Sequence, residues 1–68
     1  MRLTAREHEI VDLLAAGHTV KEIAHRLDIS IWTVRAHIET ARKRTGSRTT
    51  LQLVARFRPR RASAAALA

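Results

Sequence analysis

The chain has 68 residues, no cysteine and a formal net charge of +7 at pH 7. A domain of this size buries only about 60% of its unfolded surface, and the lack of cysteine excludes disulfide bonds and cysteine-rich zinc sites as further support. No apolar run approaches the roughly 20 residues of a membrane span and no secretory signal is recognisable, so we expect one cytoplasmic domain that gains stability by self-association.

Residues that start and end helices predict an all-α domain of four helices without strands. Thr4, Thr19 and Thr49 each precede a Glu or Gln by three residues, which is the capping-box pattern. The two glycines and the single proline each follow an amphipathic run, where these residue types end helices. The expected helices span residues 5–16, 20–27, 31–45 and 50–58.

The second and third expected helices form a helix-turn-helix pattern. Each carries apolar residues at the i, i+3, i+4, i+7 spacing of one helical face. Residues 28–30 between them are long enough only for a tight turn, and Ser30 is a favourable N-cap for the third helix. In such an arrangement the second helix of the pair can lie in the major groove of DNA.

The last expected helix is apolar on two sides. Leu51, Val54 and Ala55 share one face, which we expect to pack against the first helix. Leu53 and Phe57 lie about 150° or more from that face, because successive residues are rotated by about 100°. Since they have no obvious intramolecular partner, we predict that Leu53 and Phe57 form a homodimer interface.

Positive charge is concentrated in the C-terminal part of the chain. Residues 1–39 hold five Lys or Arg and all six acids, whereas residues 40–68 hold eight Lys or Arg and no acid. This distribution favours a polyanionic partner, and double-stranded DNA fits better than a membrane surface because no apolar helix face could insert. We expect the folded domain over residues 1–58 and a flexible, basic and alanine-rich tail over residues 59–68.

Three segments carry a resemblance to a known family. They are LTAREHEIV at residues 3–11, TVKEIA at residues 19–24 and ISIWTVRAH at residues 29–37. With this spacing the chain resembles the DNA-binding domain of LuxR-type (GerE-like) bacterial transcription regulators, over about residues 3–57. The resemblance implies a four-helix domain whose third helix enters the major groove and whose fourth helix mediates dimerisation.

The resemblance also implies roles for single residues. Arg35 and Ala36 match family positions that face base edges. Lys21 and Thr33 match positions that touch phosphates, and His37 matches a histidine beside the DNA backbone.

The side chains on the outer face of the third helix suit DNA by their own chemistry. Arg35 can donate two hydrogen bonds to guanine, and Ala36 can touch a thymine methyl group. Glu39 can accept from a cytosine amine, or it can form an ion pair with Arg35 or Arg42. Arg42 and Lys43 suit phosphate contacts, which supply affinity without sequence information.

Several positions depart from the family pattern. Glu39 replaces a residue that is often basic in relatives that use it on DNA. Ala41, Thr45 and Ser47 replace larger apolar residues, so we expect weaker packing at the corner between the third and fourth helices. Asp28 replaces a common glycine in the turn, where Asp tolerates a left-handed backbone better than most residues.

Trp32 is unusual at its family position. It can fold back on the turn or contact a deoxyribose, and we favour packing because Trp rarely stays exposed on a small monomer.

Two other interpretations remain open from the sequence. Residues 33–44 also resemble the recognition helix of sigma-factor region 4, although the capped helix after Gly46 argues against this reading. Alternatively, the domain keeps the helix-turn-helix shape but docks on RNA polymerase or another regulator, for which the arguments are the acidic Glu39 and the reduced apolar core at the corner between the third and fourth helices.

The sequence contains no pattern typical of an enzyme. No nucleophile–base pair or glycine-rich phosphate loop is present, and the histidines lack both i, i+4 spacing and cysteine partners. We therefore expect no enzymatic activity, metal, cofactor or small-molecule ligand. The sequence predicts a homodimeric, sequence-specific DNA-binding domain of transcription regulation, with two third helices about 34–36 Å apart on an inverted repeat.

Overall fold

The computed structural model describes residues 2–57 of the chain. This part contains four helices and no strand: α1 (Ala5–Ala15), α2 (Val20–Leu27), α3 (Ile31–Thr45) and α4 (Thr50–Phe57). The all-α prediction is therefore confirmed, and the helix limits that fall on described residues agree to within one residue. The expected end of the last helix at residue 58 lies outside them. The predicted tail over residues 59–68 lies outside the described residues.

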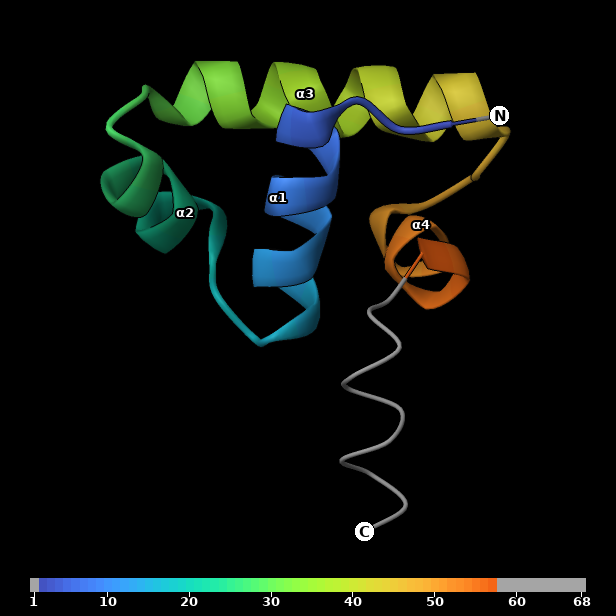
Figure 1. Cartoon of the computed structure of the whole chain (residues 1–68), viewed down its shortest axis with the longest axis horizontal. Coiled ribbons are helices and arrows are strands. Elements are labelled where there is room, and N and C mark those ends of the chain that lie inside the picture. The colour runs from blue at the N-terminus through green and yellow to red at the C-terminus, as the bar shows by residue number, and fades with distance from the viewer. Residues whose placement is uncertain (1, 58–68) are drawn as a thin grey trace, which may run out of the picture.

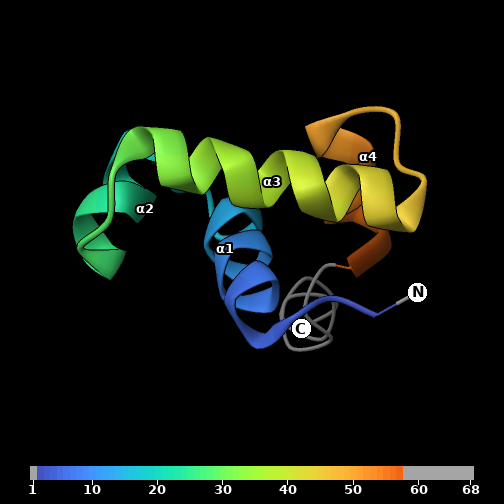
Figure 2. The same ribbon diagram turned by 90° about the horizontal axis from the view of Figure 1, so that it is seen from above.

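The longest helix, α3, lies across the other three (Figure 1). α1 runs beneath its middle, α2 beneath its N-terminal end and α4 beneath its C-terminal end, and all three contact it. Seen from above, no other helix passes over α3, so one long side of this helix faces away from the bundle (Figure 2). Within residues 2–57, none of the helices has the length and apolar character needed to cross a membrane.

Local hydrogen bonds explain where the helices begin. The hydroxyls of Thr4 and Thr19 each accept from the backbone N–H of a glutamate at 3.1 Å, and each glutamate accepts from the threonine N–H in return. Both capping boxes are therefore present as predicted. Before α4 the pattern is shifted, because Thr49 accepts from Gln52 N–H at 3.0 Å while the Gln52 side chain accepts from Arg48 N–H at 2.6 Å.

The turn between α2 and α3 depends on Asp28. This residue has φ 56° and ψ 47°, which is the left-handed region, and its N–H donates to carbonyls of the last turn of α2. Ser30 then caps α3, because its hydroxyl accepts from Thr33 N–H at 3.0 Å. The expectation that Asp replaces glycine here without loss of the turn is confirmed.

A single cluster of apolar side chains holds the helices together. The buried members come from all four helices and from the segment before α1: Leu3, Ile10, Val11, Ile23, Ala24, Val34, Ile38, Ala41 and Leu53. The inward faces predicted for the helix-turn-helix pair are buried at Ile23, Ala24, Val34, Ile38 and Ala41. The prediction was wrong for Ile31, which is 38% exposed as the first residue of α3, and Val20 and Leu27 at the ends of α2 are only half-buried.

The predicted orientation of the last helix was wrong. Leu53 is fully buried and Phe57 is half-buried against the core, whereas Leu51 is 79% exposed and Ala55 is exposed. Both sides of α4 carry apolar residues, so the pattern alone does not decide which side packs.

Candidate nucleic-acid interface

The outer face of α3 is the candidate interface. Val34, Ile38 and Ala41 hold the opposite side of this helix in the core. The side chains turned away from the core are exposed along three turns of the helix: Trp32, Ala36, Glu39, Thr40 and Lys43. Because no other helix passes over this side, α3 can enter a groove on the surface of a partner (Figure 2).

The three residues predicted to contact bases are all exposed. Ala36 lies in the middle of the outer face, and Arg35 lies on its flank. Arg35 and Glu39 line a hollow that also includes Val20 at the start of α2 and Thr50 at the start of α4. Within residues 2–57, the Arg35 side chain forms no hydrogen bond, so its guanidinium is available to a ligand.

Glu39 forms the ion pair that the sequence suggested as one of its roles. Its carboxylate accepts from both Nε and Nη2 of Arg42, with an Nε–Oε2 distance of 3.1 Å. The hydrogen bond from Arg42 lowers the pKa of the Glu39 carboxyl, and the same bond raises the pKa of Arg42. The acid on the outer face is therefore charged but directly paired.

Arg42 also connects α3 to the segment before α4. Its Nη1 donates to the carbonyl of Ser47 at 3.2 Å and to that of Arg48 at 3.0 Å. With Glu39 included, three residues of the chain engage the guanidinium that was predicted to contact phosphate. Lys43, the next residue, is exposed, and it is the better candidate for a phosphate contact.

Polar side chains fill the corner between α3 and α4. Thr45 and Ser47 are buried, and their hydroxyls lie 2.9 Å apart. The Thr45 hydroxyl also donates to the carbonyl of Ala41 at 2.9 Å, while Arg56 of α4 donates to the carbonyl of Thr45 at 2.9 Å. Hydrogen bonds thus hold this corner together in place of the contacts between larger apolar side chains that the family pattern leads one to expect. The sequence pattern did not predict these hydrogen bonds.

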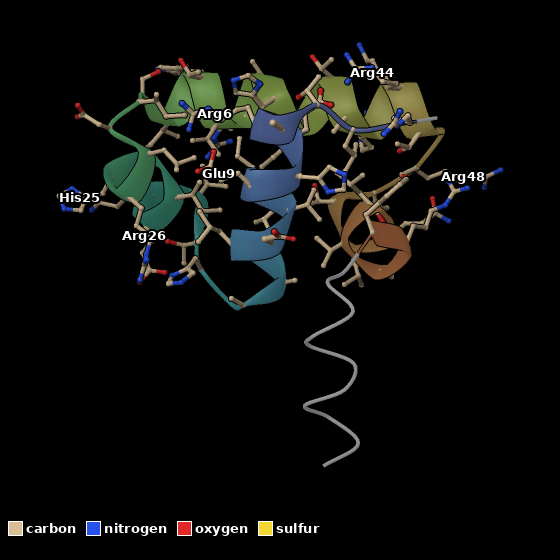
Figure 3. The ribbon with its side chains drawn as sticks, in the orientation of Figure 1. Arg6, Glu9, His25, Arg26, Arg44 and Arg48 are labelled. Atoms are coloured by element: carbon tan, nitrogen blue, oxygen red, sulfur yellow. The ribbon has the colours of Figure 1, made fainter. Side chains whose placement is uncertain are left out.

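The other predicted phosphate contacts are spread over α2 and α3. Lys21 is exposed on α2, in a hollow that it shares with His18, His25 and Arg26. Figure 3 shows His25 at the end of the molecule formed by α2 and Arg48 at the opposite end beside α4. Arg26 lies beneath α2, where it lines a hollow with residues of α1. Thr33 and His37, exposed and half-buried respectively, lie on α3 itself.

A buried ion pair joins α1 to α3, and sequence analysis did not find it. Glu7 is only 3% exposed, and its carboxylate accepts from Arg44 of α3 as well as from Thr4. Burial by itself raises the pKa of this carboxyl, but the hydrogen bonds from Thr4 and Arg44 outweigh it and lower the pKa. Figure 3 shows Arg44 near the C-terminal end of α3. The capping box identified Glu7, but nothing local pointed to a partner 37 positions away.

Trp32 does not pack on the turn, and that expectation was wrong. Its side chain is 81% exposed, which is the largest exposure among the large apolar residues described. It stands at the edge of a hollow of about 590 Å³ between α3 and the start of α1. The hollow is lined by Thr4, Glu7, Trp32, Thr33, Ala36, His37, Thr40 and Arg44.

The comparison with known families decides between the interpretations of this helix-turn-helix. The sequence profile described as "Bacterial regulatory proteins, luxR family" matches residues 1–56. The chain belongs to the luxR family. The match runs through α4, which favours this family over the resemblance to sigma-factor region 4.

Individual luxR-family relatives are similar over most of the chain. Spore germination protein GerE of Bacillus subtilis (strain 168) is 50% identical over 44 residues, which cover 65% of this chain and 60% of that protein. Transcriptional regulatory protein MctR of Rhizobium johnstonii is 40% identical over 52 residues, covering 76% of this chain and 24% of that protein. YhjB of Escherichia coli (strain K12) is 50% identical over 42 residues, 62% of this chain and 21% of that protein.

The chain thus spans between a fifth and three fifths of these relatives. No solved structure matched the chain. Within residues 2–57, this luxR-family domain has no group of three His, Cys, Asp or Glu side chains placed to hold a metal ion.

Proposed function

We propose that this luxR-family domain binds double-stranded DNA in a sequence-specific manner and regulates transcription, with α3 in the major groove. The observation that carries the proposal is the open outer face of α3 within a helix-turn-helix. Four cations and one acid lie on this helix, and the acid is paired with Arg42. A surface of this kind attracts the DNA backbone and leaves uncharged and cationic groups to contact bases.

The geometry supports different contacts for different residues. Arg35, which has no intramolecular hydrogen bond among the described residues, is proposed to donate to guanine, and Ala36 is proposed to approach a base closely. Glu39 is held by Arg42, and its remaining lone pairs can accept from a cytosine amine. Lys21 and Lys43 are proposed to contact phosphates.

We further propose that the domain forms a homodimer through the exposed side of α4. The side includes Leu51 and Ala55, with Val54 half-buried beside them. This proposal replaces the earlier assignment of Leu53 and Phe57, whose side chains pack inward. A twofold dimer would place two α3 helices on an inverted repeat with about one helical turn of DNA between half-site centres.

The competing interpretation, a protein-interaction module, was suggested by the acid Glu39 on the outer face and by the reduced apolar core at the corner between α3 and α4. The first argument is weakened because Arg42 pairs this acid, and the second because hydrogen bonds fill the corner. We propose that the domain acts by binding DNA and has no catalytic role.

Selection of bound duplexes from a random pool, followed by binding assays of the selected duplex, tests the proposal. We expect specific retardation of the selected duplex, with affinity falling steeply as salt rises because phosphate contacts release counterions. Glu9→Gln on α1, where Glu9 pairs with Arg6 at the exposed surface and belongs to none of the proposed contacts, should leave binding unchanged and serves as the control. Failure to enrich any sequence, or affinity that does not depend on salt, would contradict the proposal.

A further inference from the structure

Large exposed apolar side chains are concentrated at the start of α3. Three such residues are present among residues 2–57, and two of them, Ile31 and Trp32, are adjacent at the start of this helix. Trp32 is also the only tryptophan of the chain. A single exposed apolar residue is ordinary on a protein surface, so the neighbours of Trp32 decide whether it forms part of a site.

Trp32 is followed along the same face of α3 by two small, uncharged side chains. Ala36 and Thr40 follow it at intervals of four residues, so the three lie on successive turns of one helix face. All three are exposed, and all three line the same hollow beside the start of α1. We call Trp32, Ala36 and Thr40 the apolar strip of α3.

Cations surround the apolar strip. Arg35 lies on one flank and Arg44 on the other, and Lys43 lies at its C-terminal end. Two acids lie beside the strip and both are paired, Glu39 with Arg42 and Glu7 with Arg44, so neither repels an anionic partner strongly. The surface therefore fits a partner with negative charge at its edges and apolar groups at its centre.

The major groove of B-DNA has this character at thymines. Phosphates line its edges, and the C5 methyl group of thymine is the apolar group that bases present there. In helix-turn-helix proteins the N-terminal residues of the recognition helix contact base edges, and Trp32 is the second residue of α3. We infer that Trp32, together with Ala36, contacts thymine methyl groups and thereby selects thymines at this place in the binding site.

The spacing limits how many thymines are involved. Trp32 and Ala36 are separated by four residues, or about 6 Å along the helix axis. Base pairs are stacked about 3.4 Å apart, so the two side chains cover about two base-pair steps. The inference rests on the proposed function and adds that a thymine, or two thymines within this distance, lies opposite the start of α3.

Replacing thymine by deoxyuridine tests the inference, because this change removes only the C5 methyl group. Each thymine of the selected duplex is replaced in turn, and affinities are measured by fluorescence anisotropy. At one or two thymines we expect affinity to fall about fourfold for the unchanged protein, which corresponds to about 0.8 kcal/mol for one buried carbon group. At the other thymines we expect no change.

Two variants assign the effect to Trp32. Trp32→Ala should weaken binding to the thymine duplex and lose the sensitivity to deoxyuridine at the positions concerned. Lys43→Ala is the matched control. It should weaken binding to the thymine duplex and to the deoxyuridine duplex equally, so the fourfold difference in affinity between the two duplexes should remain. Trp32 is outside the core, and circular dichroism checks that the variant remains folded.

Tryptophan fluorescence gives a second measurement, since the chain has a single tryptophan. The inference expects the indole of the unchanged protein to be shielded from acrylamide when the duplex binds. If the duplex still binds but no position responds to deoxyuridine, the inference is wrong and the proposed function stands. Shielding of the indole would then indicate a contact between Trp32 and a sugar. If no duplex binds at all, the proposed function itself fails.

Discussion

Arg35 and Lys43 are both exposed cations of α3, and we propose different contacts for them because of their positions. Arg35 is in the N-terminal half, beside the start of α2, and the N-terminal residues of a recognition helix are those that contact base edges. Lys43 is two turns further along, close to the end of the helix, and is proposed to contact a phosphate. A guanidinium also offers the paired donors that match guanine, whereas an ammonium acts as a point charge.

Substitution by alanine should separate these two roles. Arg35→Ala is expected to weaken binding to the selected site by about 1–3 kcal/mol and to relax the preference at one base pair. Lys43→Ala is expected to weaken binding to all duplexes evenly and to reduce the slope of log affinity against log salt by about one. Anisotropy titrations on the selected duplex and its single-base variants measure both effects. Equal behaviour of the two variants would contradict the assignment.

The helix limits were predictable because they depend on neighbouring residues. A capping threonine and its Glu or Gln partner are three positions apart, so Thr4, Thr19 and Thr49 are recognisable without knowledge of the fold. The exposure of Trp32 was not predictable in this way. Its position on α3 gives a direction, but only the packed fold shows that no other element covers it.

The corner between α3 and α4 shows why the rotation of α4 was missed. Its network joins residues of the α3 end, the following segment and α4 through hydrogen bonds rather than through an apolar pattern. Sequence periodicity reports apolar faces, and α4 has two of them. Hydrophobic periodicity alone therefore could not predict that Leu53 is the residue of α4 that is buried in the core.

A double-mutant cycle should detect the hydroxyl network in this corner. Thr45→Val removes the partner of the buried Ser47 hydroxyl, and we expect it to lower the free energy of unfolding by about 1–3 kcal/mol. Ser47→Ala alone should cost less, because the Thr45 hydroxyl keeps its hydrogen bond to the Ala41 carbonyl. The double variant should lose less than the sum, because no buried hydroxyl remains without its partner. Urea unfolding measures all four proteins, and strict additivity would mean that the two hydroxyls are not coupled.

The hydrogen bonds that the half-buried Arg42 side chain makes to Glu39, Ser47 and Arg48 should also contribute to stability. We call this set of bonds the Arg42 clamp. Arg42→Ala removes the donors to Glu39 and to the Ser47 and Arg48 carbonyls, and we expect a small but measurable loss in the free energy of unfolding. Lys43→Ala at the neighbouring position has no such partners and should change stability by less than about 0.5 kcal/mol. Equal stabilities in urea unfolding would indicate that the clamp contributes nothing.

At the scale of the whole molecule, the Glu7–Arg44 pair joins the helix that lies in the middle of the bundle to the helix with the candidate interface. The pKa of Glu7 is lowered in the folded state, so the folded protein binds its proton less readily than the unfolded chain does. The stabilisation is therefore complete above the unfolded pKa of about 4.3 and is lost as the pH falls through the lower folded value. Sequence alone could not show this pair, since the two residues meet only when α1 packs under α3.

Glu7→Gln tests this pH dependence, because glutamine keeps an acceptor for the capping box but has no charge. We expect the variant to be about 1–2 kcal/mol less stable than the unchanged protein at pH 7, and the difference should shrink below pH 4. Glu9→Gln is the matched control, since Glu9 pairs with Arg6 at the exposed surface and should matter little. A Glu7→Gln difference that stays constant from pH 7 to pH 3 would contradict the role of the charge.

The surfaces proposed for DNA contact and for self-association each carry a large exposed apolar residue, on two different helices. Leu51 and Trp32 have nearly equal exposures, 79% and 81%, but they lie on α4 and α3 respectively. If α4 forms the dimer, Leu51→Glu should yield a monomer in sedimentation velocity and should bind an inverted repeat no better than a half-site. Trp32→Glu, which places the same charge on an equally exposed apolar residue, should leave the dimer intact. A dimer that survives Leu51→Glu would place the interface elsewhere, and a Trp32→Glu monomer would place it on α3, which would then be unavailable to DNA.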